Sequence, residues 1–217
     1  MLYSVVMPCA GIGSRMQLGY NKLLFKMKNG KTVLENTMAV FLKDERCREM
    51  ILAVGENDLE TIQTLIHDDR IKLVIGGATR QESVYHGLQR VTLDYVLIHD
   101  GARPFLTQEK INDLLTCLEK RNACLLMVPA KDTIKVVKDG KVISTPDRST
   151  LYQAQTPQAF KTSLVKAAFE KAENCHFIGT DDASVVEAMS EENVYMVLGD
   201  YANIKITTKD DLKYADF

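Results

Sequence analysis

A loop that combines two glycines with two basic residues follows the first apolar run of the chain. Residues 10–15 read AGIGSR and contain Gly11, Gly13 and Arg15, and Lys22 follows a few positions later. Glycine permits close approach of the backbone, and successive backbone N–H groups can form a concave nest for phosphate oxygens. Because two cations flank the loop, we predict that it holds a triphosphate. The alternative is a plain, solvated charged turn.

Two familiar glycine motifs do not fit this loop. The dinucleotide-binding motif G-x-G-x-x-G requires a glycine where the chain has Met16, and the G-K-[ST] of the P-loop is missing. The loop therefore argues against a dinucleotide oxidoreductase. Whether the loop only binds its anion or also takes part in a reaction stays open at this point.

A second candidate segment, HDGARPF (99–105), directly follows the apolar run YVLI. Asp100 can accept a hydrogen bond from a substrate hydroxyl or help to hold a divalent cation, although a role as a turn or helix cap would explain it too. Arg103 can bind a second phosphate. We predict that His99 is a hydrogen-bonded core histidine and not a catalytic one.

Further segments could contribute cations and hydroxyls to the same site. In GGATRQESV, the glycine pair that includes Gly77 can read a base edge and Ser83 adds a hydroxyl; a turn capped by Thr79 explains the pattern equally well. In NIKITT (203–208), Lys205 lies in a predicted apolar strand. It is either unremarkable on an exposed edge or a third cation at the strand end.

Two threonines complete the candidates. Thr156 lies in QTPQAF (155–160), which we interpret as an ordered loop that could contact a substrate. Thr180 is the predicted N-cap of a helix that begins in GTDDASVVEA, with two acidic residues in its first turn.

Composition narrows the class of protein. The chain has 217 residues and a net charge of -2, which favours a single domain over residues 1–217 and predicts no nucleic-acid partner. No apolar run reaches the roughly 20 residues of a membrane span, so no membrane partner is expected. Five cysteines without a C-x-x-C pair indicate reduced thiols in a cytoplasmic protein.

The elements that must position these residues alternate between strands and helices. Short, continuous apolar runs predict strands that are covered on both faces, at 4–7, 50–54, 72–75, 95–98, 124–128 and 194–198. Helical patterns lie between them, at 33–43, 57–67, 80–90, 107–121 and 161–173. This alternation predicts a mostly parallel sheet flanked by helices. Such sheets bind ligands beyond the carboxyl ends of their strands.

One segment does not follow this alternation. Residues 132–149 read as two polar, alternating strands joined by Asp139-Gly140, a strong hairpin signal. The hairpin is either an edge feature or an arm that pairs with another subunit. We favour a dimerisation arm, because an isolated two-stranded hairpin is only marginally stable in water.

Taken in order, the motifs resemble those of the 2-C-methyl-D-erythritol 4-phosphate cytidylyltransferase family. The resemblance covers essentially the whole chain and rests on PCAGIGSRM, NKL, GGATRQESV, HDGARPF, VPAKDTIK, DRS, QTPQAF, TDDAS and NIKITT. It implies a Rossmann-like nucleotidyltransferase fold and transfer of CMP from CTP to a sugar-alcohol phosphate in non-mevalonate isoprenoid biosynthesis, with Mg²⁺. It also implies a homodimer in which the 132–149 arm reaches the neighbouring site. A sister group that uses ribitol 5-phosphate for cell-wall polymers is the alternative.

The resemblance also implies roles for individual residues. The catalytic cations would be Arg15, Lys22 and Lys205. The nucleotide contacts would be Ala10, Gly11, Gly77, Ser83, Asp100 and Gly101, with Asp100 also near Mg²⁺, which substrate phosphates would mostly hold. The polyol-phosphate site would contain Arg103, Thr133, Arg148, Thr156 and Thr180, with Thr133 and Arg148 supplied by the partner's arm.

Three motifs depart from the usual pattern of the family. The usual P-A-A-G reads Pro8-Cys9-Ala10-Gly11, P-K-Q reads Asn21-Lys22-Leu23, and H-D-A-A-R reads His99-Asp100-Gly101-Ala102-Arg103. The charged positions are retained in each, so we interpret the changes as tolerated variants.

Overall fold

The computed structural model describes residues 1–11, 19–208, 210–211 and 213. Within these residues, seven strands form one sheet in the order β3-β2-β1-β4-β8-β5-β9. Their bounds are β1 (Tyr3–Pro8), β2 (Cys47–Val54), β3 (Ile71–Ile75), β4 (Tyr95–Ile98), β5 (Ala123–Pro129), β8 (Tyr152–Lys161) and β9 (Tyr195–Leu198). All neighbouring pairs are parallel except those of β8, which runs antiparallel to both β4 and β5. The predicted, mostly parallel sheet is confirmed.

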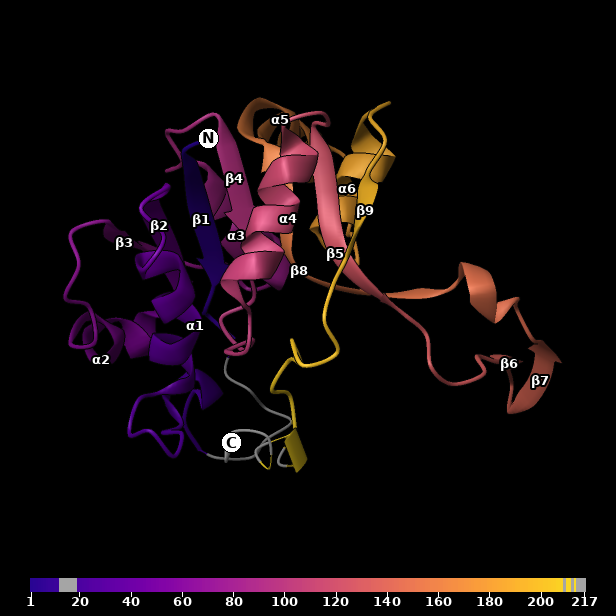
Figure 1. Cartoon of the computed structure of the whole chain (residues 1–217), viewed down its shortest axis with the longest axis horizontal. Helices are drawn as coiled ribbons and strands as arrows, with labels where there is room; N and C mark the ends of the chain where they lie inside the picture. The colour runs from indigo at the N-terminus through magenta and orange to yellow at the C-terminus, as the bar shows by residue number, and fades with distance from the viewer. Residues whose placement is uncertain (12–18, 209, 212, 214–217) are drawn as a thin grey trace.

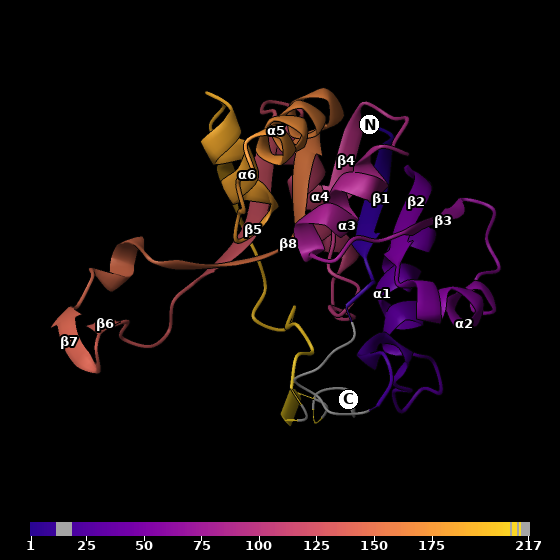
Figure 2. The same ribbon diagram turned by 180° about the vertical axis from the view of Figure 1, so that it is seen from behind.

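Helices cover both faces of this sheet (Figures 1 and 2). They are α1 (Val33–Leu42), α2 (Leu59–Gln63), α3 (Arg80–Leu88), α4 (Gln108–Leu118), α5 (Thr162–Asn174) and α6 (Asp182–Met189). Side chains of α1, α2 and α4 belong to one buried cluster, and those of α3, α5 and α6 belong to the other. The sheet therefore lies between two helical layers.

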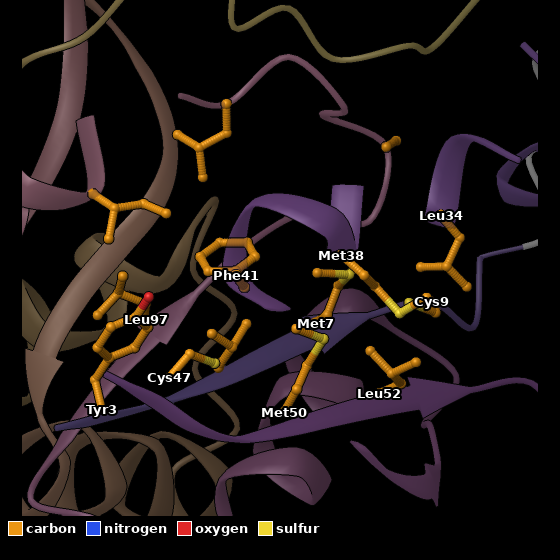
Figure 3. Close-up of a cluster of buried hydrophobic side chains, with 14 of the residues drawn as sticks. Tyr3, Met7, Cys9, Leu34, Met38, Phe41, Cys47, Met50, Leu52 and Leu97 are labelled. Atoms are coloured by element: carbon orange, nitrogen blue, oxygen red, sulfur yellow. The ribbon is translucent and has the colours of Figure 1, made fainter. Parts of the chain in front are cut away.

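The apolar runs are continuous because each strand serves both layers. In β1, Val5 and Met7 belong to the cluster with α1 and α4, whereas Val6 belongs to the opposite cluster. Alternate side chains point to opposite faces of a strand, so a strand covered on both faces is apolar at most of its positions. Figure 3 shows the first cluster, in which Phe41 of α1 packs near Tyr3 and Leu97 of the sheet.

Strand β8 corrects the prediction that residues 155–160 form a loop. The segment contains two glutamines and a proline, and proline argues against a central strand. The partner strand β5 has a register shift between Leu125 and Met127, opposite this part of β8. We attribute the tolerance of Pro157 to this irregularity, because it interrupts the regular ladder of hydrogen bonds.

The segment 203–207 is a second correction. NIKITT was predicted to be a strand, but these residues have no strand assignment. Ile206 is buried, and its N–H donates to the carbonyl of Ala102 at 2.8 Å. This backbone hydrogen bond joins the segment to the loop after β4. The segment thereby places Lys205 near the carboxyl ends of the strands.

The hairpin forms as predicted. Strands β6 (Val136–Lys138) and β7 (Lys141–Ser144) make a separate two-stranded sheet, which projects from the main body (Figures 1 and 2). Asp139 and Gly140 both have positive φ angles, of 49° and 75°, as a type I′ turn requires. Among the described residues, no helix is both long and apolar enough to cross a bilayer.

Candidate active site

A pocket of about 390 Å³ lies beyond the carboxyl ends of β1, β3 and β4. The loops that follow these strands line it together with residues 205 and 207. It brings together eight of the predicted site residues, namely Ala10, Gly11, Lys22, Gly77, Ser83, Asp100, Gly101 and Lys205. This is the edge of the sheet at which ligands are expected. Arg15, the remaining predicted catalytic cation, lies outside the described residues.

Asp100 is the electrostatic centre of the pocket. Its Oδ1 lies 2.9 Å from Nε of Arg80, and its Oδ2 lies 2.8 Å from Nζ of Lys205 and 3.7 Å from Nε of Arg103. Burial by itself would raise the pKa of Asp100, but Arg80 and Lys205 outweigh this effect and hold that pKa well below its ordinary range. The carboxylate is therefore ionised and keeps three cations close together.

Arg80 is a pocket residue that was not among the predicted site residues. Its Nη1 and Nη2 donate to the two carboxylate oxygens of Asp182 at 2.9 and 2.8 Å, while its Nε donates to Asp100. A signal for it existed in the sequence. Arg80 is the first residue of α3, a position where the helix dipole disfavours a cation, so some acidic partner was to be expected.

Lys22 approaches the pocket from a short 3₁₀ helix, η2 (Lys22–Leu24). Its Nζ donates to the carbonyl of Ile206 at 2.7 Å, and Ile206 is the residue that follows Lys205. The segment 203–207 therefore connects the two lysines. Two of the three predicted catalytic cations, Lys22 and Lys205, therefore line one pocket.

The turn before α3 is a capped turn that also borders the pocket. Thr79 forms a capping box with Glu82, as the structural alternative predicted. Ser83 accepts a hydrogen bond from the N–H of Gly77 at 3.1 Å, and both residues also line the pocket. A Cβ at Gly77 would collide with the side chain of Glu82, so the turn requires glycine there.

His99 is a buried core residue, as predicted. Its Nε2 lies 3.2 Å from the carbonyl of Arg103, and its Nδ1 lies 3.0 Å from Oγ1 of Thr156. The N–H of Asp100 donates to the same hydroxyl at 3.0 Å. Burial lowers the pKa of His99 to about 4, so the ring is neutral at pH 7. With Nε2 protonated, the ring donates to the carbonyl of Arg103 and accepts at Nδ1 from the Thr156 hydroxyl, which itself accepts from the N–H of Asp100.

The chain of hydrogen bonds also defines where Thr156 lies. Its side chain is 4% exposed, and its hydroxyl contacts Asp100 and His99 beneath the pocket. Arg103 is similarly placed, because its Nη1 donates to the carbonyl of Asn203 at 2.6 Å. Both side chains support the charged cluster around Asp100.

Thr180 is exposed and lies just before α6. It is not the N-cap that the sequence predicted, because Asp181 occupies that position and forms a capping box with Ser184. A carboxylate is at least as good an N-cap as a threonine hydroxyl. The next acidic residue, Asp182, is left as the buried partner of Arg80.

The arm carries the remaining predicted residues. Thr133 and Arg148 are exposed, and Nη1 of Arg148 donates to the carbonyl of Lys131 at 2.8 Å. Arg148 lines a separate, open hollow at the base of the arm, together with Lys131 and Asp147. Neither residue lines the pocket of its own chain, and Figure 1 shows the hairpin β6–β7 projecting away from the main body.

The donor atoms of the pocket restrict the kind of metal ion it could hold. Within the described part of the chain, no three His, Cys, Asp or Glu side chains are grouped as a metal site. Asp100 supplies one carboxylate to the pocket. Mg²⁺ is commonly bound by one or two carboxylates together with substrate phosphates. The donor set therefore fits a magnesium ion that arrives with a nucleotide and does not fit an all-protein metal centre.

The sequence of the chain is similar to that of known enzymes. The sequence model of the family described as IspD, 2-C-methyl-D-erythritol 4-phosphate cytidylyltransferase, matches residues 3–217. The enzyme of that name from Bacillus pumilus is 46% identical over 220 residues, which are 99% of this chain and 96% of the relative. The corresponding enzyme from Halalkalibacterium halodurans is 44% identical over 221 residues, covering 100% of this chain and 96% of the relative.

Solved structures give the same result for the fold. The 4-diphosphocytidyl-2C-methyl-D-erythritol synthase of Anaerococcus prevotii superimposes with a TM-score of 0.88 at 34% identity, covering 99% of this chain and 94% of the other. The 2-C-methyl-D-erythritol 4-phosphate cytidylyltransferase of Francisella tularensis superimposes with a TM-score of 0.86 at 33% identity, covering 99% and 98%.

Proposed function

This chain belongs to the 2-C-methyl-D-erythritol 4-phosphate cytidylyltransferase family, and on that premise we propose how its pocket carries out the reaction. A cytidylyl group passes from CTP to the phosphate of 2-C-methyl-D-erythritol 4-phosphate, and pyrophosphate is released. The observation that carries the assignment is the convergence of Lys22, Lys205 and Arg80 on one pocket around Asp100.

The chemistry needs no proton-abstracting side chain. The second pKa of a phosphate monoester is near 6, so the acceptor is a dianion at neutral pH. One of its oxygens attacks the α-phosphorus of CTP, and the bond from that phosphorus to the bridging oxygen breaks with its electron pair on pyrophosphate. His99, the histidine nearest to Asp100 in sequence, is buried and neutral, which is consistent with a mechanism without a general base.

The obstacle to the reaction is repulsion between two polyanions. Fixed positive charge lowers this repulsion and stabilises the charge that builds on the α-phosphate. We assign Lys22 to the triphosphate and the transition state, and Lys205 to the α-phosphate. Asp100 keeps Lys205 in place before substrate arrives, since their charged atoms lie 2.8 Å apart. Arg15 retains the role that the family resemblance implies, together with Lys22.

We assign a magnesium ion to the nucleotide-loaded pocket. Asp100 is the residue that would help to hold it, and phosphate oxygens of CTP would supply most of the remaining ligands. When bound, the ion contributes positive charge that balances the leaving pyrophosphate. The residues of the chain position the phosphates and the ammonium groups around it.

The acceptor site is completed by a second subunit in this proposal. Thr133 and Arg148 lie on an arm that does not reach the pocket of its own chain, so we infer a homodimer in which each arm serves the neighbouring pocket. The protein acts in the cytoplasm, an inference supported by its five cysteines, all of which are free thiols.

One assay tests the activity and its specificity. Pyrophosphate release is measured with each of the four common nucleoside triphosphates, with 2-C-methyl-D-erythritol 4-phosphate or ribitol 5-phosphate as acceptor, and with or without Mg²⁺. We expect release only with CTP, the methylerythritol acceptor and Mg²⁺ together.

The same assay tests the assignment of the cations. Lys205→Ala should lose roughly a hundredfold in kcat, whereas Lys120→Ala, which changes an exposed lysine that does not line the pocket, should not. CTP binding without turnover would contradict the enzymatic proposal, and normal kcat for Lys205→Ala would remove that lysine from it.

A further inference from the structure

We propose that Asn21 is a positioning residue that fixes the catalytic Lys22 at the rim of the pocket. This inference rests on the proposed role of Lys22 in cytidylyl transfer. Asn21 immediately precedes Lys22 and is only 3% exposed, although asparagine side chains are mostly found on protein surfaces.

The Asn21 side chain forms hydrogen bonds with three different segments. Its Oδ1 accepts from the N–H of Leu23 at 3.0 Å. Its Nδ2 donates to the carbonyl of Cys9 at 3.0 Å and to Oδ2 of Asp58 at 2.8 Å. One amide group thus connects η2, the end of β1 and the segment before α2.

These bonds matter because η2 depends on contacts with the rest of the chain for its position. It is a single 3₁₀ turn of three residues, and so short a helix has little stability by itself. Cys9, in contrast, is tied to the sheet, since its N–H donates to the carbonyl of Ala53 at 2.7 Å. Through Cys9, the Asn21 amide anchors the backbone of Lys22 to the central sheet.

The position of the Lys22 backbone determines where its ammonium group lies. On the far side of the pocket, Nζ of Lys22 reaches the carbonyl of Ile206 at 2.7 Å, beside Lys205. Leu23 packs in the core below. Displacement of η2 by about 1 Å would move the ammonium group away from the reacting phosphate, and misplacements of this size can cost roughly a hundredfold in rate.

A purely structural role for Asn21 makes a different prediction. Loss of buried hydrogen bonds would then lower stability and the amount of folded enzyme, with the same proportional effect whether or not Lys22 is present. A positioning role requires that the loss of kcat depend on Lys22. A double-mutant cycle between the two residues separates these possibilities.

The experiment uses the full-length enzyme with CTP, 2-C-methyl-D-erythritol 4-phosphate and Mg²⁺. The variants are Asn21→Ala, Asn21→Ser, Lys22→Ala and Asn21→Ala/Lys22→Ala, with kcat normalised to the folded fraction from urea unfolding. We expect Asn21→Ala to lower kcat by roughly tenfold to a hundredfold. In the Lys22→Ala background the same change should alter kcat by less than about twofold.

Two further variants refine the test. Asn21→Ser keeps an acceptor for the N–H of Leu23 but has a single donor, so its kcat should lie between those of wild type and Asn21→Ala. Asn29→Ala is the matched control, because the Oδ1 of exposed Asn29 accepts from the N–H of Lys31 at 3.1 Å in a similar local bond. Its kcat should equal that of wild type.

The outcomes distinguish this inference from the proposed function. Normal kcat for Lys22→Ala would overturn the assigned role of Lys22 itself. Loss of kcat in Lys22→Ala with unchanged kcat in Asn21→Ala, or with two losses that simply multiply, would overturn the positioning role alone. If Asn21→Ala does not fold, Asn21→Ser and Asp58→Ala, which removes one acceptor, are judged by the same criteria.

Discussion

Asp100 shows how one carboxylate can prepare a pocket for a polyanion. Cations gathered around an empty pocket repel one another, and a buried acid between them offsets that repulsion. The acid must itself stay charged, which requires that its cations outweigh the cost of burial. With Arg80 at 2.9 Å and Lys205 at 2.8 Å, Asp100 satisfies this condition. Lys205 can then exchange Asp100 for a phosphate, because Arg80 still pairs with the carboxylate.

Arg80 should therefore contribute to stability as well as to the site. Arg80→Gln leaves Asp182, which is 1% exposed, without its cation, and removal of one partner from a buried ion pair costs about 3 kcal/mol. Urea unfolding at pH 7 measures this loss. Arg80→Gln/Asp182→Asn should recover most of it, because residue 182 is then neutral and Asp100 keeps Lys205 at 2.8 Å.

The control for this prediction is Arg90→Gln, which changes an exposed arginine close to the end of the same helix. Surface substitutions of this kind usually change the free energy of unfolding by less than about 0.5 kcal/mol. Equal losses for the Arg80 and Arg90 variants would contradict the structural importance assigned to the Arg80 ion pairs.

His99 predicts a dependence of stability on pH. Its pKa is lowered from 6.5 to about 4 in the folded protein, so between these values the unfolded chain binds more protons at this site. Stability should then fall as pH decreases from 6.5 towards 4, by up to about 3 kcal/mol from this residue. Above pH 6.5 its contribution is complete, and below pH 4 no more is lost.

Urea unfolding at pH 6.5 and pH 4.5 measures this dependence. His99→Gln should lose less stability than wild type over this range, because it has no ring to protonate. His67→Gln, at an exposed histidine, should keep the wild-type slope. Identical slopes in all three proteins would show that His99 titrates normally.

At the scale of elements, helix α3 begins with a cation, which the helix dipole disfavours at that end. A cation at the first position of a helix costs up to about 1 kcal/mol, and Arg80 occupies that position. The capping box formed by Thr79 and Glu82 satisfies the first backbone N–H groups and returns negative charge to this end. The helix thus tolerates an arginine that the pocket uses.

The arm is the element that the chain by itself leaves incomplete. Five of its apolar side chains are between 40% and 61% exposed, namely Ile134, Val136, Val137, Val142 and Ile143. A two-stranded hairpin is marginally stable without further packing, and exposed apolar surface of this kind commonly marks a protein interface. These properties support the proposal that a second subunit covers the arm.

At the scale of the whole molecule, the proposed dimer makes a prediction about mixed subunits. Lys22→Ala inactivates the pocket of its own chain, and Arg148→Ala would weaken the pocket of the partner. A dimer with one subunit of each kind then has one complete pocket. Random mixing should therefore restore about a quarter of wild-type kcat, since half of all dimers are mixed and each has one good site of two.

Co-refolding of the two variants, followed by the pyrophosphate assay, checks this prediction. A mixture of Lys22→Ala with Lys205→Ala is the matched control and should recover nothing, because both changes affect the pocket of their own chain. If the first mixture is no more active than the mean of its two components, the cross-subunit arrangement is wrong.

Local patterns in the sequence determined the parts of the protein whose physics is local. Continuous apolar runs specified strands buried on both faces, Asp139-Gly140 specified the turn of the arm, and glycines with nearby cations indicated a phosphate pocket. The family resemblance added the identity of the reaction. The strand, turn and loop signals each lie within a few residues of what they predict, whereas the resemblance draws on the whole chain.

Only the tertiary structure decided features that join distant residues. Arg80 and Asp182 are separated by 102 positions, and no local pattern pairs them. Strand β8 contains Pro157 and polar side chains, yet it lies in the sheet because β4 and β5 flank it on both sides. The side-chain amide of Asn21 donates to Cys9, which follows β1, and to Asp58 of η3 (Glu56–Asp58), and both residues are distant in sequence. Pairing energies between remote segments, and not local propensity, settle such positions.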